Sequence, residues 1–145
     1  MSATMQELAD RLAVQDVMIK YATSCDRRDM DEYGSCFAED AIITGFGGTG
    51  GDIKGRQAWV DYVAKALTRF SGTQHLLGNQ RVWLNGDTAK LQTSVQATHF
   101  LADRPGTTLT LFATYYDDLV KRNGVWEITN HRLEPVNTQL VTADS

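Results

Sequence analysis

Cysteine and long apolar runs are both scarce in this sequence. Its 145 residues include only two cysteines, Cys25 and Cys36, and their spacing fits no metal-binding or redox motif. Two cysteines do not make a disulfide scaffold, so we expect a reducing compartment and a cytoplasmic location. The N-terminal segment MSATMQELADRLAVQDV carries charges throughout, and it therefore predicts neither a signal peptide nor a membrane span.

Positive charge is also limited. Fourteen Lys and Arg residues against 18 Asp and Glu residues give a formal net charge of −4. The only adjacent basic pairs are Arg27-Arg28 and Lys121-Arg122. Proteins that bind nucleic acid carry concentrated basic patches, so we expect no nucleic-acid partner and no membrane partner.

The remaining composition is typical of one soluble globular domain. Hydrophobic residues make up 42% of the chain and charged residues 22%, and both fractions are ordinary. A chain of this length is sufficient to bury a substantial core. Residues 1–145 are therefore expected to form a single domain.

The first half of the chain predicts three helices, over Thr4–Cys25, Met30–Phe37 and Arg56–Phe70. Thr4 and Glu7 have the spacing of a capping box at the start of the first helix. The same helix has an apolar stripe at helical spacing, made of Val14, Val17, Met18, Tyr21 and Cys25. The segment AEDAIIT that follows the second helix predicts a first strand.

The second half predicts four β-strands in succession. They cover Thr73–Leu84, Thr88–Ala102, Thr107–Val120 and Val125–Thr138. The short segments NGD, DRPG and RNG separate them, and each is a hairpin turn signal. Helices followed by an antiparallel meander indicate the α+β class, with the helices packed on one face of a curved sheet.

The glycine run TGFGGTGG contains the pattern Gly45-x-Gly47-x-x-Gly50, which is also the spelling of a dinucleotide-binding loop. That loop must lie between a parallel strand and a helix, with an acidic residue about 20 positions later. Here DIKG separates the glycines from the third helix, and only Thr68-Arg69-Phe70 stand near the required acidic position. The context therefore favours a tight loop that needs positive φ, or a lid over a pocket mouth.

Asp26 is a candidate site residue because of its place in the segment YATSCDRRDMDEY. A carboxylate at the C-terminal end of a helix faces the negative end of the helix dipole, and partial burial destabilises it further. Such a group needs a nearby donor or cation, and a histidine would serve. Alternatively, Asp26 faces solvent and pairs with Arg27 or Arg28. The residues alone leave both interpretations open.

The three histidines lie on different predicted strands. Neither face of the strand that carries His75 is clearly apolar, so the direction of His75 is open. His99 shares an apolar face with Val95 and Ala97 and is predicted to point inward, whereas the direction of His131 is open. No pair has the close spacing of a metal site such as HExxH, so no metal ion is expected.

Longer segments of the chain resemble a known family. They are VQDVMIKYATSCDRRDMDEYGSCFAEDA, IKGRQAWVDYV and NGVWEITNHRLEP. Over nearly its full length the chain resembles the SnoaL-like branch of the nuclear-transport-factor-2-like superfamily. It looks most similar to the group that holds scytalone dehydratase, bile-acid 7α-dehydratase and hexachlorocyclohexane dehydrochlorinase.

The resemblance implies roles for particular residues. In that group an aspartate at the end of the first helix pairs with a histidine on the sheet, and these match Asp26 and His75 by position. Tyr21 matches a tyrosine of the bile-acid dehydratase, and His99 matches a second histidine of scytalone dehydratase. The dehydrochlorinase has a lysine in place of Tyr21 and an arginine near the position of His131. The leaving group therefore stays open.

The resemblance also implies a shape for the fold and a place for the substrate. Three helices in the N-terminal half and a cone-shaped, strongly curved antiparallel or mixed sheet are expected to enclose a pocket. The expected pocket residues are His99, Tyr115, Val95, Ala97, Leu111, Phe112, His131 and Trp59. Relatives of this shape form trimers or dimers, so a homotrimer or homodimer is expected.

The implied activity is that of a cofactor-independent lyase or isomerase, with dehydration as the first choice. His75 would take a carbon-bound proton from a small, apolar, cyclic substrate, Asp26 would orient His75, and Tyr21 would donate a hydrogen bond to the developing oxyanion. Three other enzymes remain alternatives on the same pocket: a ketosteroid-type isomerase, a polyketide cyclase and an aldehyde-releasing lyase. A non-catalytic binding protein, similar to the β-subunit of ring-hydroxylating oxygenases, is the alternative outside enzymology.

Overall fold

The computed structural model describes residues 2–143 as three helices and six strands. The helices are α1 (Met5–Arg27), α2 (Met30–Gly34) and α3 (Arg56–Leu67). The strands are β1 (Phe37–Thr44), β2 (Ile53–Lys54), β3 (Phe70–Asn85), β4 (Thr88–Leu101), β5 (Thr107–Arg122) and β6 (Val125–Thr142). The three helices and the long strands predicted from the sequence are confirmed, with ends that differ by a few residues.

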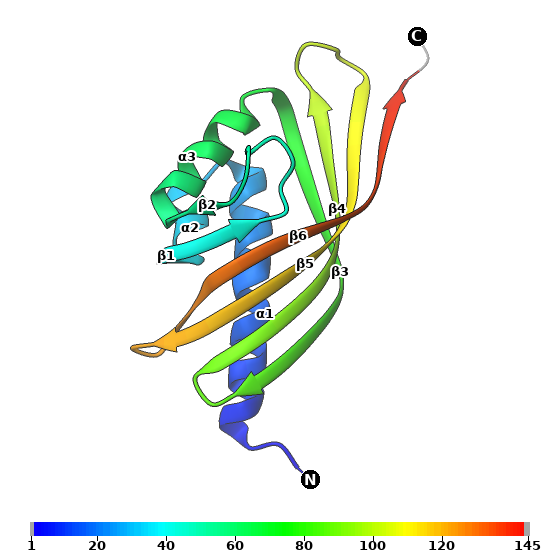
Figure 1. Cartoon of the computed structure of the whole chain (residues 1–145). Coiled ribbons are helices and arrows are strands. Elements are labelled where there is room, and N and C mark those ends of the chain that lie inside the picture. Colours follow the sequence, from blue (N-terminus) through cyan, green and yellow to red (C-terminus); the bar gives the residue numbers. More distant parts are fainter. Residues whose placement is uncertain (1, 144–145) are drawn as a thin grey trace.

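The six strands form one mixed sheet in the order β2-β1-β6-β5-β4-β3. Strand β1 runs parallel to β6, and all other neighbours are antiparallel. The sheet is strongly twisted and the helices lie on one face of it, while the β4–β5 connection and the end of β6 extend past them (Figure 1). This arrangement is the predicted α+β class with a curved sheet.

Helix α1 is defined at both ends by its own residues. Thr4 accepts a hydrogen bond from the Glu7 backbone N–H, and the Glu7 side chain accepts one from the Thr4 backbone N–H, which completes the predicted capping box. At the other end Arg28 adopts a left-handed conformation with φ of 63° and stops the helix. The apolar stripe predicted for this helix is buried. Together these features place Asp26 in the last turn, over β3.

Strand β3 contains a β-bulge that decides which side chains face the helices. Its pairing with β4 shifts between Leu77 and Gln80, where Gly78 and Asn79 lie opposite the single residue Ser94, so that β3 has one extra residue at this point. Before the bulge Thr73, His75 and Leu77 point toward the helices, and after it Gln80 and its alternate neighbours do so. The simple alternation read from the sequence fails here, because the one extra residue reverses the phase of the strand.

Strand β6 also has an irregular pairing, at the position of its proline. Its pairing with β5 shifts between Phe112 and Ala113, and the residue opposite Ala113 is Pro135. Pairing with β1 ends at Arg132, so Pro135 stands where one side of β6 has no neighbouring strand. A proline, which has no N–H to donate, is tolerated at such an edge and beside a bulge.

The glycine run forms the connection between β1 and the short strand β2, which pair antiparallel. Gly45 has φ of +83°, and a Cβ atom placed on it would lie 2.1 Å from the backbone oxygen of Leu133. The loop therefore begins beside β6, at a distance that only glycine permits. An antiparallel strand pair is not the βαβ setting of a dinucleotide site, so the structure supports the tight-loop interpretation.

The core lies between the helices and the inner face of the sheet. Trp59, Tyr33, Tyr115 and Phe37 are its largest fully buried side chains. Among the described residues, no helix is long and apolar enough to cross a membrane.

Candidate active site

Asp26 and His75 form a hydrogen-bonded pair between α1 and β3. The Asp26 Oδ1 atom lies 2.7 Å from the His75 Nδ1 atom. The Asp26 Oδ2 atom accepts a second hydrogen bond, at 2.7 Å, from the backbone N–H of His75. One carboxylate thus fixes both the strand position and the ring orientation of the histidine.

Thr73 and Arg28 form a hydrogen-bonded chain that ends on Asp26. The Thr73 hydroxyl donates to Asp26 Oδ1 at 3.0 Å, and Thr73 in turn accepts a hydrogen bond of 2.7 Å from the Arg28 guanidinium. The same guanidinium nitrogen donates to the backbone oxygen of Cys25 at the end of α1. Arg28 therefore offsets the unfavourable end of the helix dipole and acts on Asp26 through Thr73. Thr73 and His75 are thus the donors that a partly buried Asp26 at a helix end was expected to need.

The electrostatic balance at Asp26 favours the carboxylate. Burial works to raise the pKa of Asp26, but the hydrogen bonds and charge of His75 and the Thr73 hydroxyl outweigh it, so the pKa lies below the ordinary value of 3.8. Asp26 is therefore ionised at neutral pH. An ionised Asp26 can only accept hydrogen bonds, so the Nδ1 atom of His75 carries a hydrogen and donates it.

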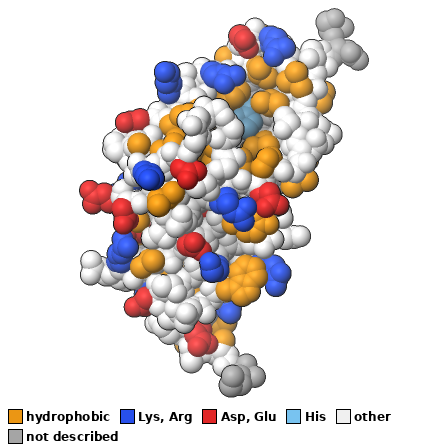
Figure 2. Space-filling model, in the orientation of Figure 1, with side chains coloured by type: hydrophobic (Ala, Val, Ile, Leu, Met, Phe, Trp, Pro, Cys, Tyr) orange, Lys and Arg blue, Asp and Glu red, His pale blue; other side chains and the backbone are white. Residues whose placement is uncertain are grey.

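The other nitrogen of His75 is open. Its Nε2 atom makes no hydrogen bond within residues 2–143, while the side chains of His75 and Asp26 are 7% and 20% exposed. On the face shown in Figure 2, exposed hydrophobic side chains gather in the upper part of the molecule. The pair thus has one ring nitrogen that is held by Asp26 and one that has no hydrogen-bond partner among the described residues.

His99 and Phe70 lie beside His75 on the same face of the sheet. The ring centres of His75 and His99 are 6.4 Å apart, and the ring of Phe70 lies 4.7 Å from that of His99. His99 Nδ1 lies 3.2 Å from the backbone oxygen of Leu109. Burial lowers the pKa of His99, so its ring is neutral at pH 7. His99 is therefore inward-facing, as the sequence predicted.

Tyr21 lies between His75 and a second buried pair, Asp117 and His131, that the sequence does not predict. The His131 Nδ1 atom lies 2.5 Å from Asp117 Oδ1, and the His131 Nε2 atom lies 3.1 Å from the Tyr21 hydroxyl oxygen. The side chains of His131 and Asp117 have no exposed surface. Burial raises the pKa of Asp117, although His131 opposes the shift. The signal in the sequence was available, because Asp117 is in phase with Tyr115 on one face of β5.

Aromatic side chains surround this second pair. The ring of Tyr21 lies 5.0 Å from that of Tyr33 and 5.5 Å from that of Tyr115. Trp59 donates a hydrogen bond of 3.0 Å from its indole nitrogen to the Tyr33 hydroxyl. Phe46, from the glycine loop, packs on Trp59 with ring centres 4.8 Å apart. The expected pocket residues Trp59, Tyr115 and His131 thus lie together in the closed core, each at most 2% exposed.

The apolar wall residues divide between the two faces of the sheet. Val95, Ala97 and Leu111 lie on the face that carries His75, since His75 pairs with Ala97 and Ala97 with Leu111. Phe112 points the other way and lines a hollow with Leu76 on the outer face. The expectation that Phe112 belongs to the pocket is therefore wrong, because consecutive residues of a strand point to opposite faces.

Cys25, Asp26 and His75 are the group of described residues whose geometry could suit a metal ion. Their possible ligand atoms lie within 4.8 Å of one another. Cysteine binds metals as a thiolate, but burial and then the Asp26 charge raise the pKa of Cys25 to about 12. Asp26 and His75 also use their facing atoms for each other. The donor chemistry therefore fits a hydrogen-bonded pair better than a metal site.

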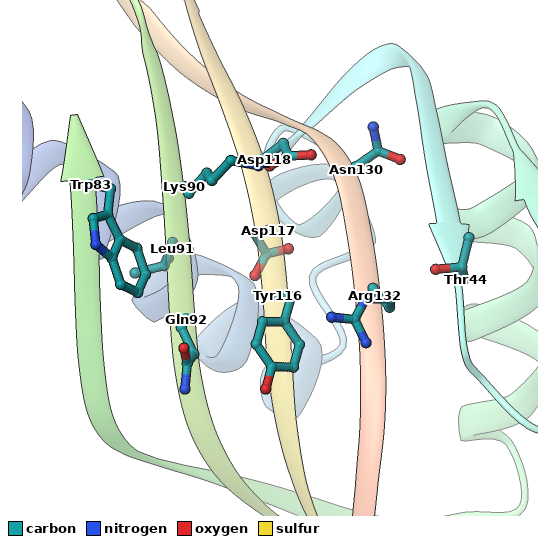
Figure 3. A pocket seen from close by; sticks show the side chains of 10 residues that line it. All are labelled: Thr44, Trp83, Lys90, Leu91, Gln92, Tyr116, Asp117, Asp118, Asn130 and Arg132. Carbon is teal, nitrogen blue, oxygen red and sulfur yellow. Dashed lines mark hydrogen bonds and ion pairs between the residues drawn. The ribbon is translucent and has the colours of Figure 1, made fainter. Parts of the chain in front are cut away.

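A separate hollow of about 650 Å³ lies on the outer face of the sheet. Trp83, Lys90, Tyr116 and Arg132 surround it, with the Arg132 guanidinium stacked 4.2 Å from the Tyr116 ring (Figure 3). Neither Asp26 nor His75 lines it. Its side chains are mostly charged or amide groups, and Asp117, the partner of His131, is among them although its side chain has no exposed surface.

The SnoaL-like domain family matches residues 6–132, and the chain belongs to this family. An uncharacterized protein of Mycobacterium tuberculosis is 29% identical over 127 residues, which cover 86% of this chain and 84% of that protein. A Mycobacterium bovis protein matches to the same extent.

Solved structures confirm the fold. A proposed scytalone dehydratase from Novosphingobium aromaticivorans superposes with a TM-score of 0.82 at 24% identity, covering 95% of this chain and 91% of that one. A type 2 hexachlorocyclohexane dehydrochlorinase gives 0.84 at 22% identity, covering 94% and 92%. A proposed aromatic ring hydroxylase from N. aromaticivorans gives 0.82 at 26% identity, covering 94% of each chain.

Proposed function

We propose that this SnoaL-like protein is a lyase or isomerase in which His75 removes a carbon-bound proton from a small apolar substrate. The observation that carries the proposal is the geometry of one residue. His75 Nδ1 is held by an ionised carboxylate at 2.7 Å, and its Nε2 has no hydrogen-bond partner within residues 2–143. This is the arrangement that a general base requires.

The proton transfer follows from the tautomer that Asp26 imposes. With a hydrogen on Nδ1, the lone pair of His75 lies on Nε2 and can accept a proton from carbon. The imidazolium that forms carries a positive charge directly against the Asp26 carboxylate, which stabilises it. The side chains of both residues are largely shielded from water, and this strengthens the interaction.

The surroundings of His75 favour an apolar substrate. Phe70 and Leu77 lie near it on β3, Val95, Ala97 and Leu111 lie on the same face, and His99 is neutral. Nothing in this set would hold a strongly charged group. We assign the hydrogen bond to an oxygen of the substrate to Tyr21, whose ring lies 6.2 Å from that of His75 and whose hydroxyl lies 3.1 Å from His131 Nε2.

Dehydration is the reaction we favour within this class. Loss of a hydroxyl group next to the ionised carbon needs a hydrogen-bond donor for the leaving oxygen, and Tyr21 is a candidate donor. Structural similarity to dehydratase and dehydrochlorinase proteins supports the elimination class, and the match rests on the fold. Without a leaving group, the same base would catalyse isomerisation.

The experiment is hydrogen–deuterium exchange followed by NMR. Wild type, His75→Ala and Gln74→Ala are incubated in D₂O with a panel of cyclic ketones and β-hydroxy carbonyl compounds. Gln74 is the matched control because it is the neighbouring residue on β3 and points to the opposite, exposed face. The proposal expects exchange or elimination with wild type and Gln74→Ala, and a loss of about 10²-fold or more with His75→Ala. Equal rates with His75→Ala contradict it.

A further inference from the structure

The buried Asp117–His131 pair has no role in the proton abstraction described above. Neither side chain has any exposed surface, and the Asp117 Oδ1 atom lies 2.5 Å from the His131 Nδ1 atom. The Asp117 Oδ2 atom has no hydrogen-bond partner among the described residues. A pair of ionisable groups this deep in a core is costly unless its charges balance.

Charge balance restricts where the protons of this pair lie. A neutral His131 that donated to an ionised Asp117 would leave a net negative charge in the core, with one donor for two carboxylate oxygens. Within residues 2–143, Asp117 has no lysine or arginine as an ion-pair partner. The two neutral arrangements are an imidazolium facing a carboxylate and a neutral imidazole facing a carboxylic acid. Both place a hydrogen on His131 Nε2.

That hydrogen determines what the Tyr21 hydroxyl can do. His131 Nε2 lies 3.1 Å from the Tyr21 oxygen, so a protonated Nε2 donates to it and Tyr21 accepts. The hydroxyl hydrogen of Tyr21 is then not used by His131, and the hydroxyls of Tyr33 and Tyr115 are the other groups within residues 2–143 that hydrogen-bond with Tyr21. In the opposite tautomer Tyr21 would donate to His131 and would have no hydrogen left for a substrate.

We propose that Asp117 and His131 are positioning residues for Tyr21, holding its oxygen through His131 Nε2–H so that its hydroxyl hydrogen is directed toward a substrate at His75. The inference rests on the proposed function, because it deepens the role of Tyr21 in that site. The packing of Tyr33, Tyr115 and Phe37 around the Tyr21 ring, with centres 5.0–5.9 Å apart, keeps the hydroxyl in place.

The proton position can be read without a substrate. The chain has only three histidines, so a long-range ¹H–¹⁵N NMR spectrum of wild type at pH 8.5 resolves each ring, and His75→Ala and His99→Ala assign the signals. We expect a hydrogen on Nε2 of His131 and, as the internal comparison, on Nδ1 of His75. A bare Nε2 on His131 overturns the inference. A hydrogen on Nε2 of His75 instead counts against the proposed function and leaves the inference standing.

A double-mutant cycle supplies the kinetic readout on a compound that wild type turns over. Tyr21→Phe and His131→Phe are each expected to lower kcat by about 10²-fold with little change in KM, and the double variant should lose no more than either one. His131→Gln, which retains an N–H near the Nε2 position, should recover most of the rate. Losses that multiply in the double variant contradict the inference. If His131→Phe does not fold, the NMR measurement of the hydrogen on His131 Nε2 tests the inference by itself.

Discussion

At the residue scale, the site depends on how one carboxylate is held. Asp26 accepts hydrogen bonds from the Thr73 hydroxyl, the His75 ring and the His75 backbone. The sequence predicted that a partly buried Asp26 at a helix end needs such donors. It could not identify Thr73 or Arg28, because they become neighbours only when β3 crosses the end of α1.

These hydrogen bonds make the stability of the fold depend on pH. The pKa of Asp26 is depressed in the folded state, so its contribution is complete above the unfolded value of about 4 and is lost as the pH falls through the lower folded value. Asp26→Asn should therefore unfold more easily than wild type at pH 7, and the difference should shrink below pH of about 4. Denaturant unfolding between pH 3 and 7 measures this, with the exposed Asp16→Asn on the same helix as control. A gap that stays constant with pH argues against the ionised Asp26.

At the element scale, the sequence predicts regular segments well and their irregularities poorly. Helix α1, its capping box and the four long strands were predicted from periodicity and turn residues, which are local signals. The direction of His75 was left open because the bulge after Leu77 changes the phase of β3. The pocket position expected for Phe112 conflicts with the alternation of β5, and Asp117 is not predictable as a site residue from its own strand alone because its partner His131 lies on another strand.

The glycine loop offers a test at the same scale. Gly45→Ala should lower the free energy of unfolding by at least about 2 kcal/mol, since alanine is strained at φ of +83° and its Cβ would meet the Leu133 oxygen. Gly47→Ala is the matched control, because a Cβ there has no atom within 4 Å. Its effect should stay within about 0.5 kcal/mol in the same denaturant titration. Equal effects at the two glycines would show that the close approach of Gly45 to Leu133 does not hold in solution.

At the scale of the whole molecule, the outer face of the sheet is unusually apolar for a surface. Leu76, Trp83, Phe100, Val136 and Val141 are each between 43% and 72% exposed. Exposed apolar side chains that gather on one face indicate a surface for association. We propose that copies of the chain associate through this face as a homotrimer or homodimer.

Analytical ultracentrifugation tests the association. Wild type should sediment as two or three copies of the 16.1 kDa chain. Leu76→Asp, which places a charge on the outer face, should shift the protein to single copies, whereas Ala58→Asp on exposed α3 should leave the assembly unchanged. A wild type that sediments as one copy, or a Leu76→Asp variant that assembles normally, removes the basis for this proposal.

The most direct test of the central claim, that Asp26 and His75 act together on a carbon-bound proton, is the exchange rate in Asp26→Asn. The compound used is the one that wild type exchanges fastest in D₂O, with Asp16→Asn as control. Replacing the carboxylate removes the partner that fixes Nδ1–H and stabilises the imidazolium, so we expect the rate to fall by about 10²-fold or more while Asp16→Asn matches wild type. A rate in folded Asp26→Asn equal to that of wild type would contradict the account.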